Sequence, residues 1–379
     1  MEFIDALRGA ACLAVVLFHA FGGTHPRDIG GSSFAALSPA HHAFSTFVGL
    51  GYRGVALFLC LSGLCLFLPC VRKQPIDEVR VGFAEFMKRR SLRILPPYYA
   101  ALIIFMVLIR LNLAHMITGM PGTIGGPRSV LLHLSMLYNL SASTIGRVCG
   151  AFWSLAVEYQ TYLAFPAMLW VVRRYGLRGL VGAAFAVSVG WGAYAARVVV
   201  PSRDWTWDFV YHDTPLDFCW FFVVGMLCAA LIARPEYARM RAPLMTAGFI
   251  CLAPAIVCEM APVPYYVANL IWGVVFGGGI VAASCLNADI FHINPLLRAL
   301  YRIGVFSYSI YLIHQPLVAF AVRRVPGPFG LFIAIASAVA VGYLFHIVFE
   351  RPFMNTPYSG RPAATRKERH VAGRPMKEA

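Results

Sequence analysis

Ten apolar stretches, each long enough to cross the hydrocarbon core of a bilayer, limit what this chain can fold into. With a mean hydropathy of +0.68, 59% hydrophobic residues and 13% charged residues, it carries more apolar surface than one soluble core can bury. Inside a membrane the backbone polar groups must bond to one another, and a helix achieves this within one segment. We therefore predict an all-α fold, a polytopic membrane helix bundle with about ten transmembrane helices. The predicted spans are 6–23, 52–71, 95–114, 151–172, 179–199, 215–233, 243–261, 265–287, 304–322 and 328–349.

The Lys and Arg residues are distributed unevenly between the connections on the two sides of the membrane. If the N-terminus is cytoplasmic, 23 of the 32 Lys and Arg residues fall on that side and 8 on the other, with Arg110 left inside a span. The positive-inside rule then predicts that both termini are cytoplasmic. Topology and attraction to anionic lipid account for the net charge of +15 without a nucleic-acid partner, although a bound polyanion stays open for the cluster at 71–93.

The domain organisation is predicted to be simple. Residues 1–352 form one transmembrane domain, and residues 353–379 form a basic cytoplasmic tail whose Pro, Gly and alternating charges predict disorder. Most of the ten cysteines lie in apolar stretches, where cysteine behaves as a small hydrophobe, so we expect no disulfide framework. We also expect no bound metal.

Arg8 and His19 interrupt the first apolar stretch. Eleven helical steps separate them by about 16 Å and by nearly three turns, so both side chains can project from one face at different depths. Ionisable side chains are expensive to bury in lipid, so this pair predicts a functional site. Two structural alternatives stay open: His19 bonds to a neighbouring helix, or Arg8 extends to the cytoplasmic interface.

Ser62 and Gly63 lie in the middle of the second predicted span. Small residues there let another helix approach closely, and this packing role is as well supported as a contact with substrate. A nucleophilic role for Ser62 is not favoured, because the sequence places no catalytic partner beside it.

A basic cluster, Arg89, Arg90 and Arg93, directly precedes the third predicted span. Guanidinium groups bind phosphates through paired hydrogen bonds, so a phosphorylated cofactor is a candidate ligand for the cluster. The alternative is ordinary anchoring at the cytoplasmic face. Taken alone, the cluster does not distinguish these two roles. Its occurrence together with His19 favours binding of a phosphorylated cofactor over anchoring.

Two later spans carry polar side chains inside apolar surroundings. Glu158 is the one acid in its span, with Ser154 one turn earlier on the same face. A carboxylate in a membrane points to function, and the structural alternative is an ion pair with an arginine such as Arg110. Tyr311 and His314 share a later span, where a structural role for the histidine is somewhat favoured over a catalytic one.

Five sequence blocks together resemble the acyltransferase-3 family of integral-membrane O-acyltransferases. The Arg8 to His19 spacing in the first block and the order of all five match the family, and the resemblance extends over roughly residues 2–352. The blocks are IDALRGAACLAVVLFH, GVALFLCLSG, RRSLRILPPYY, FWSLAVEYQTYLAFP and SYSIYLIHQPL.

The resemblance implies transfer of an acyl group, usually acetyl from acetyl coenzyme A, to a hydroxyl of a cell-surface polysaccharide, glycolipid or glycosylated small molecule. It also implies a bacterial cytoplasmic (inner) membrane location and acyl coenzyme A, a carbohydrate acceptor and the lipid bilayer as partners. The residues with implied roles are Arg8 and His19 as the essential pair, Arg89, Arg90 and Arg93 as a coenzyme A contact, and the block Trp153, Ser154 and Glu158.

The chemistry of such a transfer assigns distinct tasks to the first span. A neutral imidazole can take the proton of a sugar hydroxyl as that hydroxyl attacks a thioester carbonyl, so His19 is the candidate base. Arg8 would hold the phosphates of the cofactor or align its pantetheine arm. A covalent route, in which His19 carries the acyl group itself, stays open.

A secondary transporter or glycan flippase is the alternative from a different class. It would use Arg8, Glu158 and His314 as an ion or proton relay. The absence of a detectable sequence repeat between the two halves argues against it, as does the cytoplasmic basic cluster.

Overall fold

The computed structural model describes residues 1–21, 39–113, 123–202, 210–325 and 327–354, and in these residues the regular structure is helical throughout. Short 3₁₀ turns join several of the helices, and a π-helical turn, His346–Glu350, follows α15. The α-helices are α1 (Glu2–Ala20), α2 (Pro39–Gly49), α3 (Gly54–Lys73), α4 (Phe83–Arg110), α6 (Pro127–Leu134), α7 (Trp153–Ser202), α9 (Pro215–Ala233), α10 (Arg241–Met260), α11 (Tyr265–Ser284), α12 (Ile290–Ile293), α13 (Pro295–Val305), α14 (Ser307–Arg324), α15 (Pro328–Phe345) and α16 (Arg351–Met354).

The helices are long and apolar enough to confirm a polytopic membrane bundle. Within the described residues eight segments have the length and hydropathy of a membrane span, or nine if α13 and α14, which meet at 86°, count as one broken span. All ten predicted ranges fall on these segments. With the broken span included there are nine segments rather than ten, because the predicted ranges 151–172 and 179–199 both lie in one segment, Gly150–Val198.

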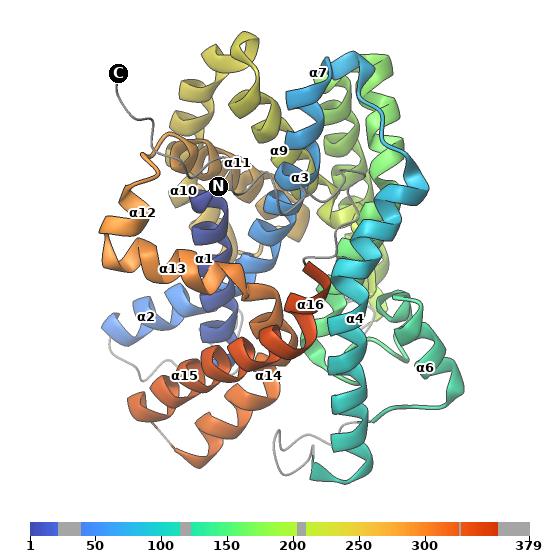
Figure 1. Cartoon of the computed structure of the whole chain (residues 1–379), viewed down its shortest axis with the longest axis vertical. Coiled ribbons are helices and arrows are strands. Elements are labelled where there is room, and N and C mark those ends of the chain that lie inside the picture. The colour runs from blue at the N-terminus through green and yellow to red at the C-terminus, as the bar shows by residue number, and fades with distance from the viewer. Residues whose placement is uncertain (22–38, 114–122, 203–209, 326, 355–379) are drawn as a thin grey trace, which may run out of the picture.

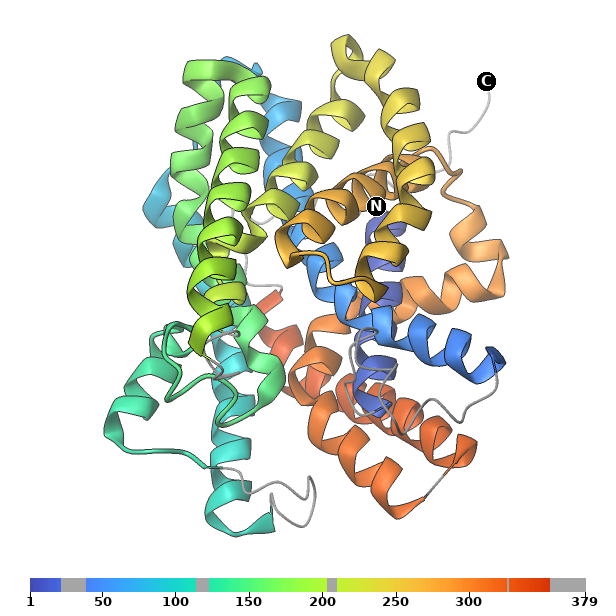
Figure 2. The same cartoon turned by 180° about the vertical axis from the view of Figure 1, so that it is seen from behind.

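That long segment is two helices joined at a sharp turn. Gly176 has φ 69° and ψ −176°, a backbone conformation that L side chains rarely adopt and glycine reaches without strain. The chain reverses there, and the two halves of α7 lie side by side in both views (Figures 1 and 2). The sequence prediction of two separate spans was therefore right about this part of the chain.

Helix α1 lies in the interior of the bundle (Figure 1) and packs against α3, α13, α14 and α15. Beside it, α3 and α9 cross at backbone contact distance. A Cβ atom on Gly63 would lie 2.0 Å from the Phe222 carbonyl oxygen, and one on Gly225 would lie 1.8 Å from the Cys60 carbonyl oxygen. Gly63 thus has the packing role that its sequence position indicated.

Two of the basic connections predicted to be cytoplasmic lie at one end of the bundle. The turn within α7, next to Arg173 and Arg174, lies at the same end as the link between α9 and α10 (Figure 1, top). The C-terminal end of α4 and the link between α14 and α15 lie at the opposite end. The cytoplasmic location of both termini stays a prediction, and all but two residues of the predicted tail, 353–379, lie outside the described residues.

Candidate active site

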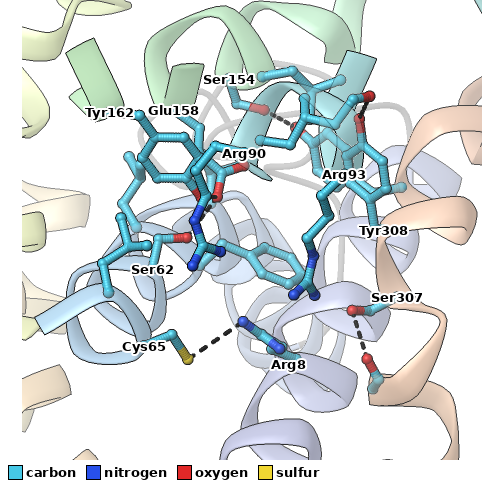
Figure 3. A pocket seen from close by; sticks show the side chains of 18 of the residues that line it. Arg8, Ser62, Cys65, Arg90, Arg93, Ser154, Glu158, Tyr162, Ser307 and Tyr308 are labelled. Atoms are coloured by element: carbon cyan, nitrogen blue, oxygen red, sulfur yellow. Dashed lines mark hydrogen bonds between the residues drawn. The ribbon is translucent and has the colours of Figure 1, made fainter. Parts of the chain in front are cut away.

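A pocket opens between α1, α3, α4, α7 and the start of α14 (Figure 3). It encloses about 910 Å³ of space not filled by atoms, including its open mouth. Apolar side chains from α3 form much of its wall. The polar and charged side chains in its lining are those of Arg8, Ser62, Cys65, Arg90, Arg93, Ser154, Glu158, Tyr162, Ser307, Tyr308, Tyr311 and Glu350.

Three arginines converge on one side of the pocket. Figure 3 shows the guanidinium groups of Arg8, Arg90 and Arg93 pointing toward the same space. The Arg8 guanidinium lies 3.4 Å from both the Asp5 carboxylate and the Cys65 sulfur. The Nε of Arg90 is buried and has no hydrogen-bond partner among the described residues. Because guanidinium donors converge on an open space, this side of the pocket is suited to an anion with several acceptor oxygens.

A carboxylate, that of Glu158, lies beside Arg90 in the pocket (Figure 3). Glu158 Oε1 accepts hydrogen bonds from the Ser62 hydroxyl at 2.6 Å and the Tyr162 hydroxyl at 2.5 Å. These two donors come from α3 and from the next turn of α7, so they hold the Glu158 side chain in place. Arg110, the partner left open by the sequence, is instead exposed at the end of α4.

Ser154 and Tyr311 form the inner wall of the pocket. Their side-chain oxygens lie 2.6 Å apart, and the Tyr311 hydroxyl donates to the Ala151 carbonyl at 3.0 Å. The Ser154 hydroxyl also lies 3.4 Å from the Ala151 carbonyl oxygen, so the two hydroxyls share this acceptor and either can donate to the other. Phe58 packs edge-on against the Tyr311 ring, with centroids 6.0 Å apart.

Two histidines meet behind this wall. His19 Nδ1 lies 3.0 Å from His314 Nε2, and the His314 ring lies next to Tyr311 with centroids 5.5 Å apart. His314 is fully buried and His19 partly so. The sequence places Arg8 and His19 on one helix face, but in the structure Arg8 lines the pocket and His19 does not. Tyr311 is the side chain common to both groups.

Some predicted site residues lie away from the pocket. Arg89 forms an exposed ion pair with Glu85 at 3.2 Å, one turn earlier on α4, so it projects from a different face than Arg90. Trp153 begins α7 and packs against Phe218, with ring centroids 5.5 Å apart. Neither is part of the pocket lining, and their functional roles stay predictions.

Glu350 lines the pocket but is not among the candidate site residues that the sequence indicated. His346, four positions earlier, donates from Nδ1 to Glu350 Oε2 at 2.8 Å, and Ser309 donates to the same oxygen at 2.6 Å. Glu350 also ends the π-helical turn, a distortion often found at functional sites. The available signal was an acid at the end of an apolar span, the feature that singled out Glu158.

Comparison with known proteins agrees with this picture. The acyltransferase-3 family model, described as an acyltransferase domain, matches residues 1–349. "Acyltransferase MdmB" of Streptomyces mycarofaciens is 25% identical, over 96% of this chain and 94% of that protein. "Putative membrane-bound transacylase BcsY" of Komagataeibacter xylinus is 26% identical, over 90% of this chain and 77% of that protein.

A further relative is "Putative peptidoglycan O-acetyltransferase YrhL" of Bacillus subtilis, which is 25% identical over 76% of this chain and 47% of that protein. No solved structure matches the chain. The family model extends over nearly the whole sequence, which favours the acyltransferase over the transporter alternative. The chain therefore belongs to the acyltransferase-3 family and is an integral-membrane acyltransferase.

Proposed function

We propose that the protein transfers an acyl group, in the first instance acetyl, from acyl coenzyme A to a carbohydrate hydroxyl at the bacterial cytoplasmic membrane. The acceptor class is a cell-surface polysaccharide, glycolipid or glycosylated small molecule. The observation that carries the donor assignment is the convergence of Arg8, Arg90 and Arg93 on one side of a pocket. The name of the Bacillus relative, an O-acetyltransferase acting on peptidoglycan, supports the acceptor class.

The arginines suit the phosphate groups of coenzyme A. Its pyrophosphate and its ribose phosphate offer several anionic oxygens, which guanidinium donors bind in pairs. The buried, unpartnered Nε of Arg90 gains an acceptor when such a group enters. The first residues of α14, Ser307 and Tyr308, also line the pocket, so the positive end of that helix faces the same anion.

The transfer itself needs a base for the acceptor hydroxyl. In our proposal His19 takes the hydroxyl proton while the oxygen attacks the thioester carbonyl, and the carbon–sulfur bond breaks to release coenzyme A. Arg8 and His19 lie about 16 Å apart along α1, a separation that the extended pantetheine arm of the donor would bridge. Its path runs past Phe58 and Tyr311, which stand between the arginines and the histidines.

The test is acetyl transfer by membranes containing the protein, with radiolabelled acetyl coenzyme A as donor. Two products are measured together, labelled glycan and free coenzyme A thiol, because a transporter would generate neither. The wild type and His19→Ala are compared at equal membrane abundance with His292→Ala, which removes an exposed histidine on α12.

We expect label and thiol from the wild type and His292→Ala, and neither from His19→Ala. Equal rates for His19→Ala and the wild type would remove His19 as the base. Labelled His19 recovered after acid-free denaturation of the wild type, and absent from His19→Ala, would instead establish the covalent route.

A further inference from the structure

Within the described part of the chain, hydrogen bonds engage three of the four ring nitrogens of the histidine pair, and their partners identify which nitrogens carry protons. His314 Nδ1 lies 2.8 Å from the Tyr311 carbonyl oxygen, and His314 Nε2 lies 3.0 Å from His19 Nδ1. His19 Nδ1 also lies 3.1 Å from the Val15 carbonyl oxygen. His19 Nε2 is the nitrogen that these contacts leave available.

Carbonyl oxygens only accept hydrogen bonds, so each Nδ1 beside one must carry a proton. His314 therefore donates from Nδ1 to Tyr311, and in its neutral form its Nε2 has a lone pair. His19 donates from Nδ1, shared between that lone pair and the Val15 carbonyl. A proton on His314 Nε2 as well would place an uncompensated charge on a fully buried ring, which is expensive.

We propose that His314 is a positioning residue that holds His19 in the tautomer with its proton on Nδ1. The lone pair needed to accept a proton then sits on Nε2 of His19, which is free to face the acceptor hydroxyl. This inference rests on the proposed function, because it gives His314 a task only if His19 is the base. Positioning of a catalytic histidine through its second nitrogen is a general device in enzyme sites.

The pair also holds the charge that forms during transfer. When the acceptor hydroxyl gives its proton to His19 Nε2, the ring becomes an imidazolium and its Nδ1–H becomes a stronger donor to His314 Nε2. The acceptor oxygen has by then bonded to the acyl carbon, and the electron pair of the broken carbon–sulfur bond leaves with the coenzyme A thiolate. The proton on Nε2 then passes to that thiolate or to water, which restores the neutral pair.

Two amide substitutions separate positioning from mere packing, because each can replace one nitrogen of His314. His314→Gln can place its amide oxygen near the former Nε2, where it accepts from His19. His314→Asn can reach only the former Nδ1 position, where it keeps the bond to the Tyr311 carbonyl and loses His19. The two variants are similar in polarity, and only one retains the relevant contact.

The experiment measures kcat and KM for acetyl transfer, at equal membrane abundance and with thermal unfolding in detergent recorded for each variant. We expect His314→Asn to lower kcat about 10- to 100-fold with little change in KM for acetyl coenzyme A. His314→Gln should recover most of that loss. The exposed His292→Gln serves as the matched control.

Equal loss of kcat in the Asn and Gln variants would overturn the proposal, as would a change confined to KM. Unchanged activity in His314→Asn, with His19→Ala inactive, would remove the role of His314 and leave the base assignment intact. Full activity in His19→Ala would show that the proposed base itself is wrong. If His314→Asn does not accumulate, His314→Met replaces it, with the same expected loss of kcat and the same rescue by His314→Gln.

Discussion

The Ser62 hydroxyl lies 2.6 Å from Glu158 Oε1 and connects α3 to α7 in the wall of the pocket. The Tyr162 hydroxyl reaches the same oxygen at 2.5 Å, so two protons converge on one carboxylate oxygen. Oε1 has two lone pairs and can accept both of these hydrogen bonds. The bond from Ser62 joins two residues that are 96 positions apart in the sequence.

The shared oxygen predicts coupling between Ser62 and Tyr162. Ser62→Ala and Tyr162→Phe each leave one donor on Glu158, and each is expected to destabilise the protein by about 1 kcal/mol. The double variant leaves Oε1 without either donor, so its loss should exceed the sum of the single losses. Thermal or denaturant unfolding in detergent, analysed as a double-mutant cycle, measures this. Additive effects would show that the two hydroxyls act on Glu158 independently.

Adjacent arginines on α4 should differ in their effect on the acyl donor. Arg90→Gln removes a guanidinium that lines the pocket and should raise KM for acetyl coenzyme A about 10- to 100-fold, the range for a lost charged hydrogen bond. Arg89→Gln removes only the exposed pair with Glu85 and should change KM little. Initial rates against donor concentration test both. Equal increases for the two variants would contradict the arrangement of α4 seen here.

The crossing of α3 and α9 should tolerate no added side chain. Gly225→Ala puts a Cβ 1.8 Å from a backbone carbonyl of α3, so the helices must separate, and we expect about 1–3 kcal/mol of destabilisation. Gly279→Ala is the control, because a Cβ there meets nothing within 4 Å. Thermal unfolding and membrane abundance provide the comparison. Similar unfolding temperatures for both variants would show that α3 and α9 lie far enough apart to accommodate the added methyl group.

The predicted orientation can be checked with a membrane-impermeant thiol reagent on intact cells. Arg174 lies by the turn of α7 and Arg324 by the link between α14 and α15, both exposed and at opposite ends of the bundle. With the exposed Cys285 replaced by Ser, a cysteine at position 324 should react and one at position 174 should react only after permeabilisation. The reverse pattern would place both termini outside the cytoplasm.

Much of the fold was readable from the sequence because a membrane makes span formation a local property. A segment such as α9 must satisfy its own backbone and must be apolar over about 20 residues, and both conditions are visible in its residues alone. The sharp turn at Gly176 was located for the same reason, since Arg173, Arg174 and Arg178 interrupt the hydropathy there. What the residues did not show is that this turn is a single glycine with positive φ.

The sequence by itself determined the all-helical membrane architecture, the family and the polar positions Arg8, Glu158 and His314 within apolar spans, because desolvation marks a polar group in such a span. Only the tertiary structure decided which of them meet. Hydrogen bonds act over about 3 Å, so the pairing of His19 with His314, 295 positions away, depends on how α1 and α14 cross. The tertiary structure likewise decided that Arg90 lines the pocket and Arg89 does not, because this depends on which face of α4 is turned toward α1.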